Sequence, residues 1–288
     1  MSTPRDLFFI LGNPRSGTTL LRLMLNNHPE IAVPPECGFT EWLWEDFGQM
    51  EMNSSTYSAF LQKLQKTKKF ETWFLDSAQL FLSIQKKNPK SYQELVLEVY
   101  MEYARVSGKN PTLLGDKNNY YINRVEKLNR IFPDCKKIFI VRDGRDVASS
   151  YLELLTQREG RLYEPKLEEA ILDIANKWKE SIRVGQKWTA RGDICLRYED
   201  LVENPKAALT MACHFLSLDY SESMLSYFSN NDEPNEFKSW KWKTFEPIST
   251  DSLGRYKTDL SNEQIDLFQA VAGSELVDCG YKMAFPSI

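Results

Sequence analysis

Histidine, paired cysteines and long apolar runs are all scarce in this chain of 288 residues. It has 2 histidines and 5 cysteines, with no Cys-x-x-Cys pair, so we expect reduced, mostly buried thiols. No apolar run approaches the roughly 20 residues of a membrane-spanning helix, and residues 1–6 are too short for a secretory signal. We therefore expect no membrane span and a cytoplasmic location; that the chain is an excised domain of a larger protein is the alternative. The net charge of −4 argues against a general nucleic-acid-binding surface.

A glycine-bracketed loop is the most informative motif that is present. The apolar run Leu7–Leu11 is followed by Gly12-Asn13-Pro14-Arg15-Ser16-Gly17-Thr18-Thr19. Two glycines around four residues, between a strand and a helix, are typical of a phosphate-binding loop. The lysine that triphosphatases require is missing: Thr18 takes its place, and Arg15 brings the cation inside the loop. Such a loop is suited to a 5′-phosphate without a metal-bound γ-phosphate. A plain strand-to-helix turn is the alternative.

A second basic motif follows a second apolar strand. Lys136–Val141 reads as a buried parallel strand, and it ends in Arg142 before a predicted helix, Val147–Leu155. Open α/β sheets bind ligands at the carboxyl ends of their strands. Arg142 there suits a phosphate that no Mg²⁺ bridges, and Ser150, two helical turns on, could add a neutral donor. Alternatively, Arg142 and Asp143 only cap and pair at a helix start.

Together the two motifs resemble the sulfotransferase superfamily, whose donor is 3′-phosphoadenosine 5′-phosphosulfate (PAPS). The similarity covers almost the whole chain and is closest in style to the tyrosylprotein sulfotransferases and their bacterial relatives. It implies that Arg15, Ser16, Gly17, Thr18 and Thr19 bind the 5′-phosphosulfate, and that Arg142 and Ser150 bind the 3′-phosphate. His28-Pro29, Ile131-Phe132-Pro133 and Tyr198-Glu199-Asp200-Leu201 match in order. In the last motif the resemblance places Tyr198 against the adenine.

Glu36 is the expected general base, because a hydroxyl that attacks sulfur must lose its proton. It lies in a proline-restricted loop eight residues after His28, as the catalytic glutamate does in the family. A solvated surface carboxylate is the alternative, and His28 and His214 are expected to be structural.

Lys117 aligns with the family lysine that contacts the transferring sulfonate or the bridging oxygen, where an ammonium would offset developing negative charge. The family usually has proline two residues later, where this chain has Asn119. A surface lysine is the alternative.

A lid-like segment is predicted over about residues 230–257. Its run Lys238–Lys243 alternates basic and aromatic residues, which is also typical of an edge strand. Lys241 falls near the position of a catalytic serine in tyrosylprotein enzymes. The segment ends in Gly254-Arg255-Tyr256, which matches a family triplet and makes Arg255 a candidate phosphate or sulfonate contact.

The predicted architecture is a three-layer, P-loop-like α/β fold with a central parallel sheet, forming a single domain over residues 1–288. Helical patterns at Thr56–Lys66, Phe70–Gln85 and Tyr92–Val106 predict an insertion over about residues 41–108. This block either lines the acceptor pocket or packs over the sheet.

The resemblance implies a sulfotransferase that needs no metal and moves a sulfonate from PAPS to a hydroxyl, or less often an amine. It would release 3′-phosphoadenosine 5′-phosphate (PAP). A small molecule, a glycan or a peptide could be the acceptor, and the oligomeric state is open. The alternatives are a nucleoside or small-molecule kinase, which would need Mg²⁺ and a loop lysine, and a non-catalytic protein that binds PAPS or PAP.

Overall fold

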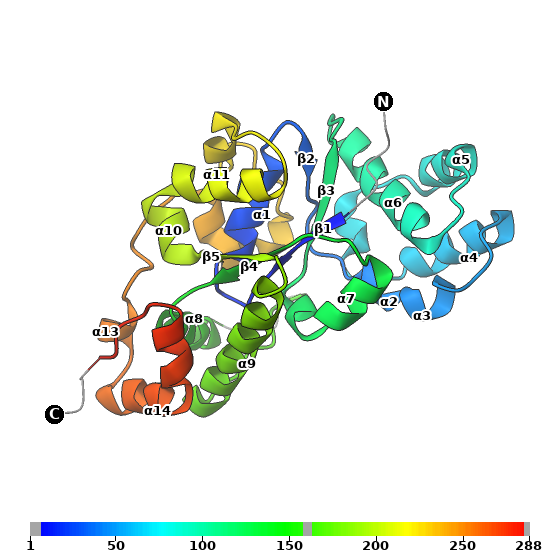
Figure 1. Cartoon of the computed structure of the whole chain (residues 1–288). Coiled ribbons are helices and arrows are strands. Elements are labelled where there is room, and N and C mark those ends of the chain that lie inside the picture. The colour runs from blue at the N-terminus through cyan, green and yellow to red at the C-terminus, as the bar shows by residue number, and fades with distance from the viewer. Residues whose placement is uncertain (1–6, 158–162, 285–288) are drawn as a thin grey trace. The chain divides into compact units, whose positions relative to one another are not determined.

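The protein is described by a computed structural model that covers residues 7–157 and 163–284. Its five strands form one sheet in the order β2-β3-β1-β4-β5 (Figure 1). Every residue of β1 and β4 is buried, as expected for parallel strands that helices cover. The strands are β1 Leu7–Leu11, β2 Ile31–Ala32, β3 Leu113–Lys117, β4 Lys137–Val141 and β5 Ile194–Arg197.

The first of two compact units comprises Met1–Ile10, Arg22–Lys137 and Ser221–Pro234. Within it β3 pairs in parallel with β1 and with β2, and α6 packs against β3. Its helices and 3₁₀ turns are α2 Phe39–Trp42, α3 Trp44–Phe47, α4 Ser54–Leu64, η1 Phe70–Trp73, α5 Ser77–Lys87, α6 Tyr92–Val106, η2 Asn119–Asn123, α7 Val125–Ile131 and η3 Glu222–Ser226.

Side-chain caps explain where the helices of the insertion begin. Asn53, Asp76 and Ser91 each accept a hydrogen bond from a backbone N–H in the first turn of α4, α5 and α6. The predicted continuous helix Phe70–Gln85 is wrong: a 3₁₀ turn ends at Phe74, whose φ is 52°, and α5 starts only after Asp76. Residues 39–106, all of them described, contain helices and no strand, as predicted.

The second unit comprises Leu11–Leu21, Ile138–Tyr220 and Asn235–Ile288. Here β4 and β5 pair in parallel, α9 and α11 contact β5, and α14 packs along α9 around Trp178 and Phe268. Helix α1, Thr18–Asn26, starts in this unit. The others are α8 Gly144–Thr156, α9 Ile171–Thr189, α10 Tyr198–Glu203, α11 Pro205–Phe215, η4 Asn235–Phe237, α12 Lys238–Lys241, η5 Trp242–Phe245, α13 Tyr256–Asp259 and α14 Asn262–Asp278.

The predicted α/β class, with a central parallel sheet and flanking helices, is confirmed. The edge-strand interpretation of Lys238–Lys243 is wrong, because these residues form α12 and the start of η5. Across residues 7–157 and 163–284, no helix has both the length and the apolar character that a bilayer crossing requires.

Candidate donor-binding and catalytic sites

The glycine-bracketed loop joins β1 to α1 and has the backbone shape of an anion-binding turn. Arg15 and Gly17 both have positive φ, 69° and 92°, and the Ser16 N–H donates to the Asn13 carbonyl at 3.1 Å. Positive φ is costly for a residue with a side chain, so its presence at Arg15 marks a conformation that the loop requires. The turn ends at Thr18, where α1 begins, and the amino-terminal end of a helix favours a bound anion.

Glycine is required at position 17 by packing as well as by φ. A Cβ atom there would lie 2.4 Å from Cδ2 of Tyr198. The Tyr198 ring also lies below the Arg142 guanidinium, at 4.9 Å from its centroid. The ring therefore connects the loop to the end of β4.

Arg15 points to the residue predicted to share a phosphate with Arg142. Its Nε donates to Ser150 Oγ at 3.0 Å, and its Nη1 donates to the Trp240 carbonyl at 3.1 Å. Burial and then the neighbouring Arg142 guanidinium lower the pKa of Arg15. A bound anion would therefore stabilise the positive charge of Arg15.

Arg142 follows β4 and is held by two main-chain oxygens. Its Nη1 donates to the Arg15 carbonyl at 3.1 Å and its Nη2 to the Ser252 carbonyl at 2.5 Å. Among the described residues neither Arg15 nor Arg142 is paired with a carboxylate within 4.0 Å, and Arg142 Nε and Ser16 Oγ are buried without a hydrogen-bond partner. A half-buried guanidinium at Arg15, a buried one at Arg142 and two orphaned polar atoms fit an anionic ligand with several oxygens.

The Gly254-Arg255-Tyr256 triplet is fixed to the start of α8. Asp146 accepts hydrogen bonds from the N–H groups of Gly254 at 2.7 Å and Tyr256 at 2.9 Å. The Arg255 side chain is paired with Glu153 at 2.8 Å and Asp259 at 2.9 Å. Its hydrogen bond to Glu153 is the main reason that its pKa is raised. Its predicted contact with the donor would have to compete with these carboxylates.

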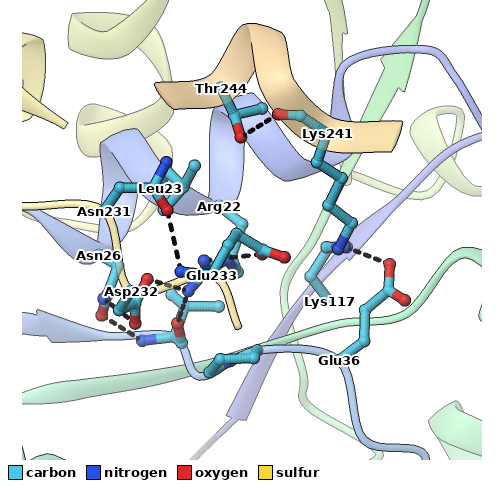
Figure 2. Close-up of polar contacts among 12 residues, drawn as sticks. Arg22, Leu23, Asn26, Glu36, Lys117, Asn231, Asp232, Glu233, Lys241 and Thr244 are labelled. Carbon is cyan, nitrogen blue, oxygen red and sulfur yellow. Dashed lines mark hydrogen bonds and ion pairs between the residues drawn. The ribbon is translucent and has the colours of Figure 1, made fainter. Parts of the chain in front are cut away.

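Glu36 and Lys117, the two predicted catalytic residues, form a buried ion pair in the first unit (Figure 2). Lys117 is the last residue of β3 and its side chain is 0% exposed. The other carboxylate oxygen of Glu36 is 2.7 Å from Lys69 Nζ. Lys69 was missed by sequence reasoning, because only the fold brings the turn before η1 back to the Glu36 loop. The Glu36 carboxylate therefore lies between two ammonium groups.

The turn around Lys69 is anchored to the Glu36 loop by two further bonds. Trp73 Nε1 donates to the Pro35 carbonyl at 2.9 Å, and Cys37 Sγ lies 3.7 Å from the Lys68 carbonyl. The helical insertion therefore helps to position Glu36. This links a part of the chain without recognisable motifs to a predicted catalytic residue.

The two histidines lie in different environments, and their expected structural role stays a prediction. His28 is buried and its Nδ1 accepts from the Glu30 N–H at 3.1 Å, while His214 is exposed on α11.

A buried ion network holds the residues just before Pro234 within the first unit. The Arg22 guanidinium, 0% exposed, lies 2.7 Å from Asp232 and 2.7 Å from Glu233 (Figure 2). Asn26 also donates to Asp232 at 2.9 Å. Breaking this network would leave the fully buried Arg22 guanidinium without these two carboxylate partners, so we assign it a structural role.

Asp116, next to Lys117 on β3, is enclosed by hydroxyl groups. Tyr121 donates to its Oδ2 at 2.8 Å, and the Tyr100 and Thr40 hydroxyls, hydrogen-bonded to each other, are among the groups that act on it. Burial raises the pKa of Asp116 from 3.8 to about 7, although the hydroxyls and Lys117 act in the opposite direction. The fold therefore favours the protonated acid.

This preference predicts how stability changes with pH. The contribution of Asp116 is fully present below pH about 4 and is lost as pH rises through about 7, because the folded state binds the proton more tightly. Replacing Asp116 with asparagine should flatten the pH dependence of the unfolding free energy in this window, where one proton accounts for at most about 1.4 kcal/mol per pH unit. Urea unfolding at pH 5 and pH 8 measures it. Asp134→Asn, at an exposed position, is the control; identical slopes for all three proteins would contradict the prediction.

Comparison with known proteins agrees with this geometry. The model of the sulfotransferase family matches residues 7–222. Protein-tyrosine sulfotransferase 1 of Danio rerio is 26% identical over 230 residues, which are 77% of this chain and 56% of the relative. Protein-tyrosine sulfotransferase 2 of Gallus gallus is 27% identical over 239 residues, 78% of this chain and 55% of the relative. The chain thus spans little more than half the length of these two relatives.

A solved sulfotransferase domain from the curacin biosynthetic pathway superposes with a TM-score of 0.66 at 22% identity, covering 98% of this chain and 100% of that one. This likeness concerns the fold. The family match extends from β1 through the loop, Arg142 and Tyr198 to η3. The chain belongs to the sulfotransferase family.

Proposed function

We propose that this sulfotransferase uses PAPS as its donor, with the whole chain acting as one catalytic domain. The observation that carries the proposal is the pair of neighbouring guanidiniums, Arg15 half-buried and Arg142 buried, which have orphaned polar atoms beside them and no carboxylate partner among the described residues. Residues 15–19 would bind the 5′-phosphosulfate, and Arg142 with Ser150 the 3′-phosphate. Tyr198 would lie against the adenine, and Arg255 would contact a phosphate or the sulfonate.

The remaining chemistry is assigned to the buried ion pair of the first unit. The donor supplies a sulfonate on a good leaving group. Glu36 would take the proton of the acceptor hydroxyl as the new S–O bond forms and the bond to the bridging phosphate oxygen breaks. Lys117 would offset the charge that appears on that oxygen. The ion pair keeps the Lys117 ammonium beside Glu36, where it would also be able to interact with the reacting oxygens.

The acceptor is proposed to present a hydroxyl, or less often an amine, on a small molecule, a glycan or a peptide. The relatives named as protein-tyrosine sulfotransferases favour testing tyrosyl peptides first. Metal independence and a cytoplasmic location stay predictions. Screening acceptor pools with radiolabelled PAPS separates an enzyme from a protein that only binds the nucleotide, since the latter would give no labelled product.

PAP is expected to raise the melting temperature more than ATP does, with or without Mg²⁺. The reason is that Arg142 and Ser150 suit a 3′-phosphate, which ATP lacks, and that at equal concentration the ligand that binds the folded state more tightly stabilises it more. A melting series with PAP, ATP and adenosine 5′-monophosphate (AMP), each with and without Mg²⁺, measures the shifts. A larger shift with Mg-ATP would favour the kinase alternative.

A further inference from the structure

Lys243, in η5, is connected to Arg142 through a single residue. Its Nζ donates to Ser252 Oγ at 3.3 Å, and the carbonyl of the same serine accepts from Arg142 Nη2 at 2.5 Å. Neither the family resemblance nor the sequence pattern gives Lys243 a role. The geometry brings its ammonium to the end of the site where Arg142 Nε has no partner among the described residues.

The charges around Lys243 are predominantly positive. Partial burial and then the Arg255 guanidinium lower the pKa of Lys243, and Arg142 and Arg15 act in the same direction. Glu153 acts in the opposite direction but is already paired with Arg255 at 2.8 Å. Like charges held this close destabilise one another, and a phosphate with nearly two negative charges would relieve them.

We propose that Lys243 binds the 3′-phosphate of the nucleotide together with Arg142, and thereby selects nucleotides that carry this group. The inference rests on the proposed use of PAPS. Arginine gives the phosphate a flat, directional fork, whereas lysine adds a mobile point charge that can follow the phosphate oxygens. A side chain from the segment predicted to be lid-like would thus contribute to recognition of the nucleotide.

The experiment is a calorimetric titration of wild type, Lys243→Met and Lys257→Met with PAP and with AMP, which lacks the 3′-phosphate. Methionine removes the charge and keeps much of the stem. Lys257 is exposed on α13 in the same segment, so its replacement is matched in net charge. Lys243→Met should weaken PAP about tenfold and leave AMP unchanged, whereas Lys257→Met should change neither. Lys243→Arg should keep most of the affinity for PAP.

Equal PAP affinity in wild type and Lys243→Met would overturn the inference. Equal weakening of PAP and AMP would overturn the assignment to the 3′-phosphate. Wild-type protein that does not bind PAP would instead contradict the proposed donor, so the two failures are distinguishable. Melting temperatures without nucleotide check that each variant is folded.

Discussion

Replacing Glu36 with glutamine is expected to lower turnover about 10²-fold or more and to leave PAP affinity nearly unchanged. Glutamine keeps the shape of the side chain but cannot take a proton, so the loss falls on the chemical step. The phosphates are assigned to other residues, all of them in the second unit. Initial rates with an acceptor from the screen measure turnover, and calorimetry measures PAP binding.

Glu41→Gln is the matched control for this prediction. Glu41 is also buried and also paired with a lysine, at 2.7 Å from Lys127 Nζ, but it has no assigned catalytic role. Loss of both turnover and PAP affinity in Glu36→Gln would indicate a defect in folding, since Lys117 loses its charged partner. Unchanged turnover would exclude Glu36 as the base and return attention to His28.

Arg142→Ala is expected to weaken PAP by about 2 kcal/mol or more, roughly 30-fold, the scale for losing one partner of a charged hydrogen-bonded pair. AMP is the matched ligand because it lacks the 3′-phosphate. Arg142 also bonds to the Arg15 carbonyl, so some loss of AMP affinity would report a disturbed loop. The difference between the two nucleotides isolates the 3′-phosphate.

Calorimetric titration of wild type and Arg142→Ala with both nucleotides gives this difference. An Arg142→Ala protein with wild-type affinity for PAP would show that the arginine at the end of β4 is structural. Its main role would then be to stabilise the fold through its hydrogen bonds to the carbonyls of Arg15 and Ser252.

The clustering of the candidate donor-site residues could be predicted from the sequence because its signals are local. A loop between a buried strand and a helix, and an arginine at the end of another such strand, are short patterns whose geometry the backbone dictates. The structure brings Arg15, Arg142, Ser150 and Tyr198 together within one unit as these patterns imply.

Lys69 and Lys243 could not be found in the same way. Lys69 reaches Glu36 across 33 positions of the chain, and Lys243 approaches Arg142 only because Ser252 links them. Nothing in the neighbouring residues distinguishes such a lysine from a solvated one.

The secondary structure of two segments was predicted wrongly for a related reason. Phe70–Gln85 has a helical apolar pattern but is interrupted at Phe74 and Asp76, and the alternating run near Trp240 is helical because packing overrides periodicity.

The segment after residue 235 supplies one hydrogen-bond acceptor to Arg15 and one to Arg142. Both acceptors are main-chain carbonyls, those of Trp240 and Ser252. Every amino acid has such an oxygen, so this part of the site is specified by the path of the backbone and not by residue type. Side-chain changes that preserve the path would keep both bonds, while an insertion, a deletion or a proline that redirects the chain would remove them. Comparing motifs among relatives would therefore overlook this contribution; comparing the lengths of the segment would detect it.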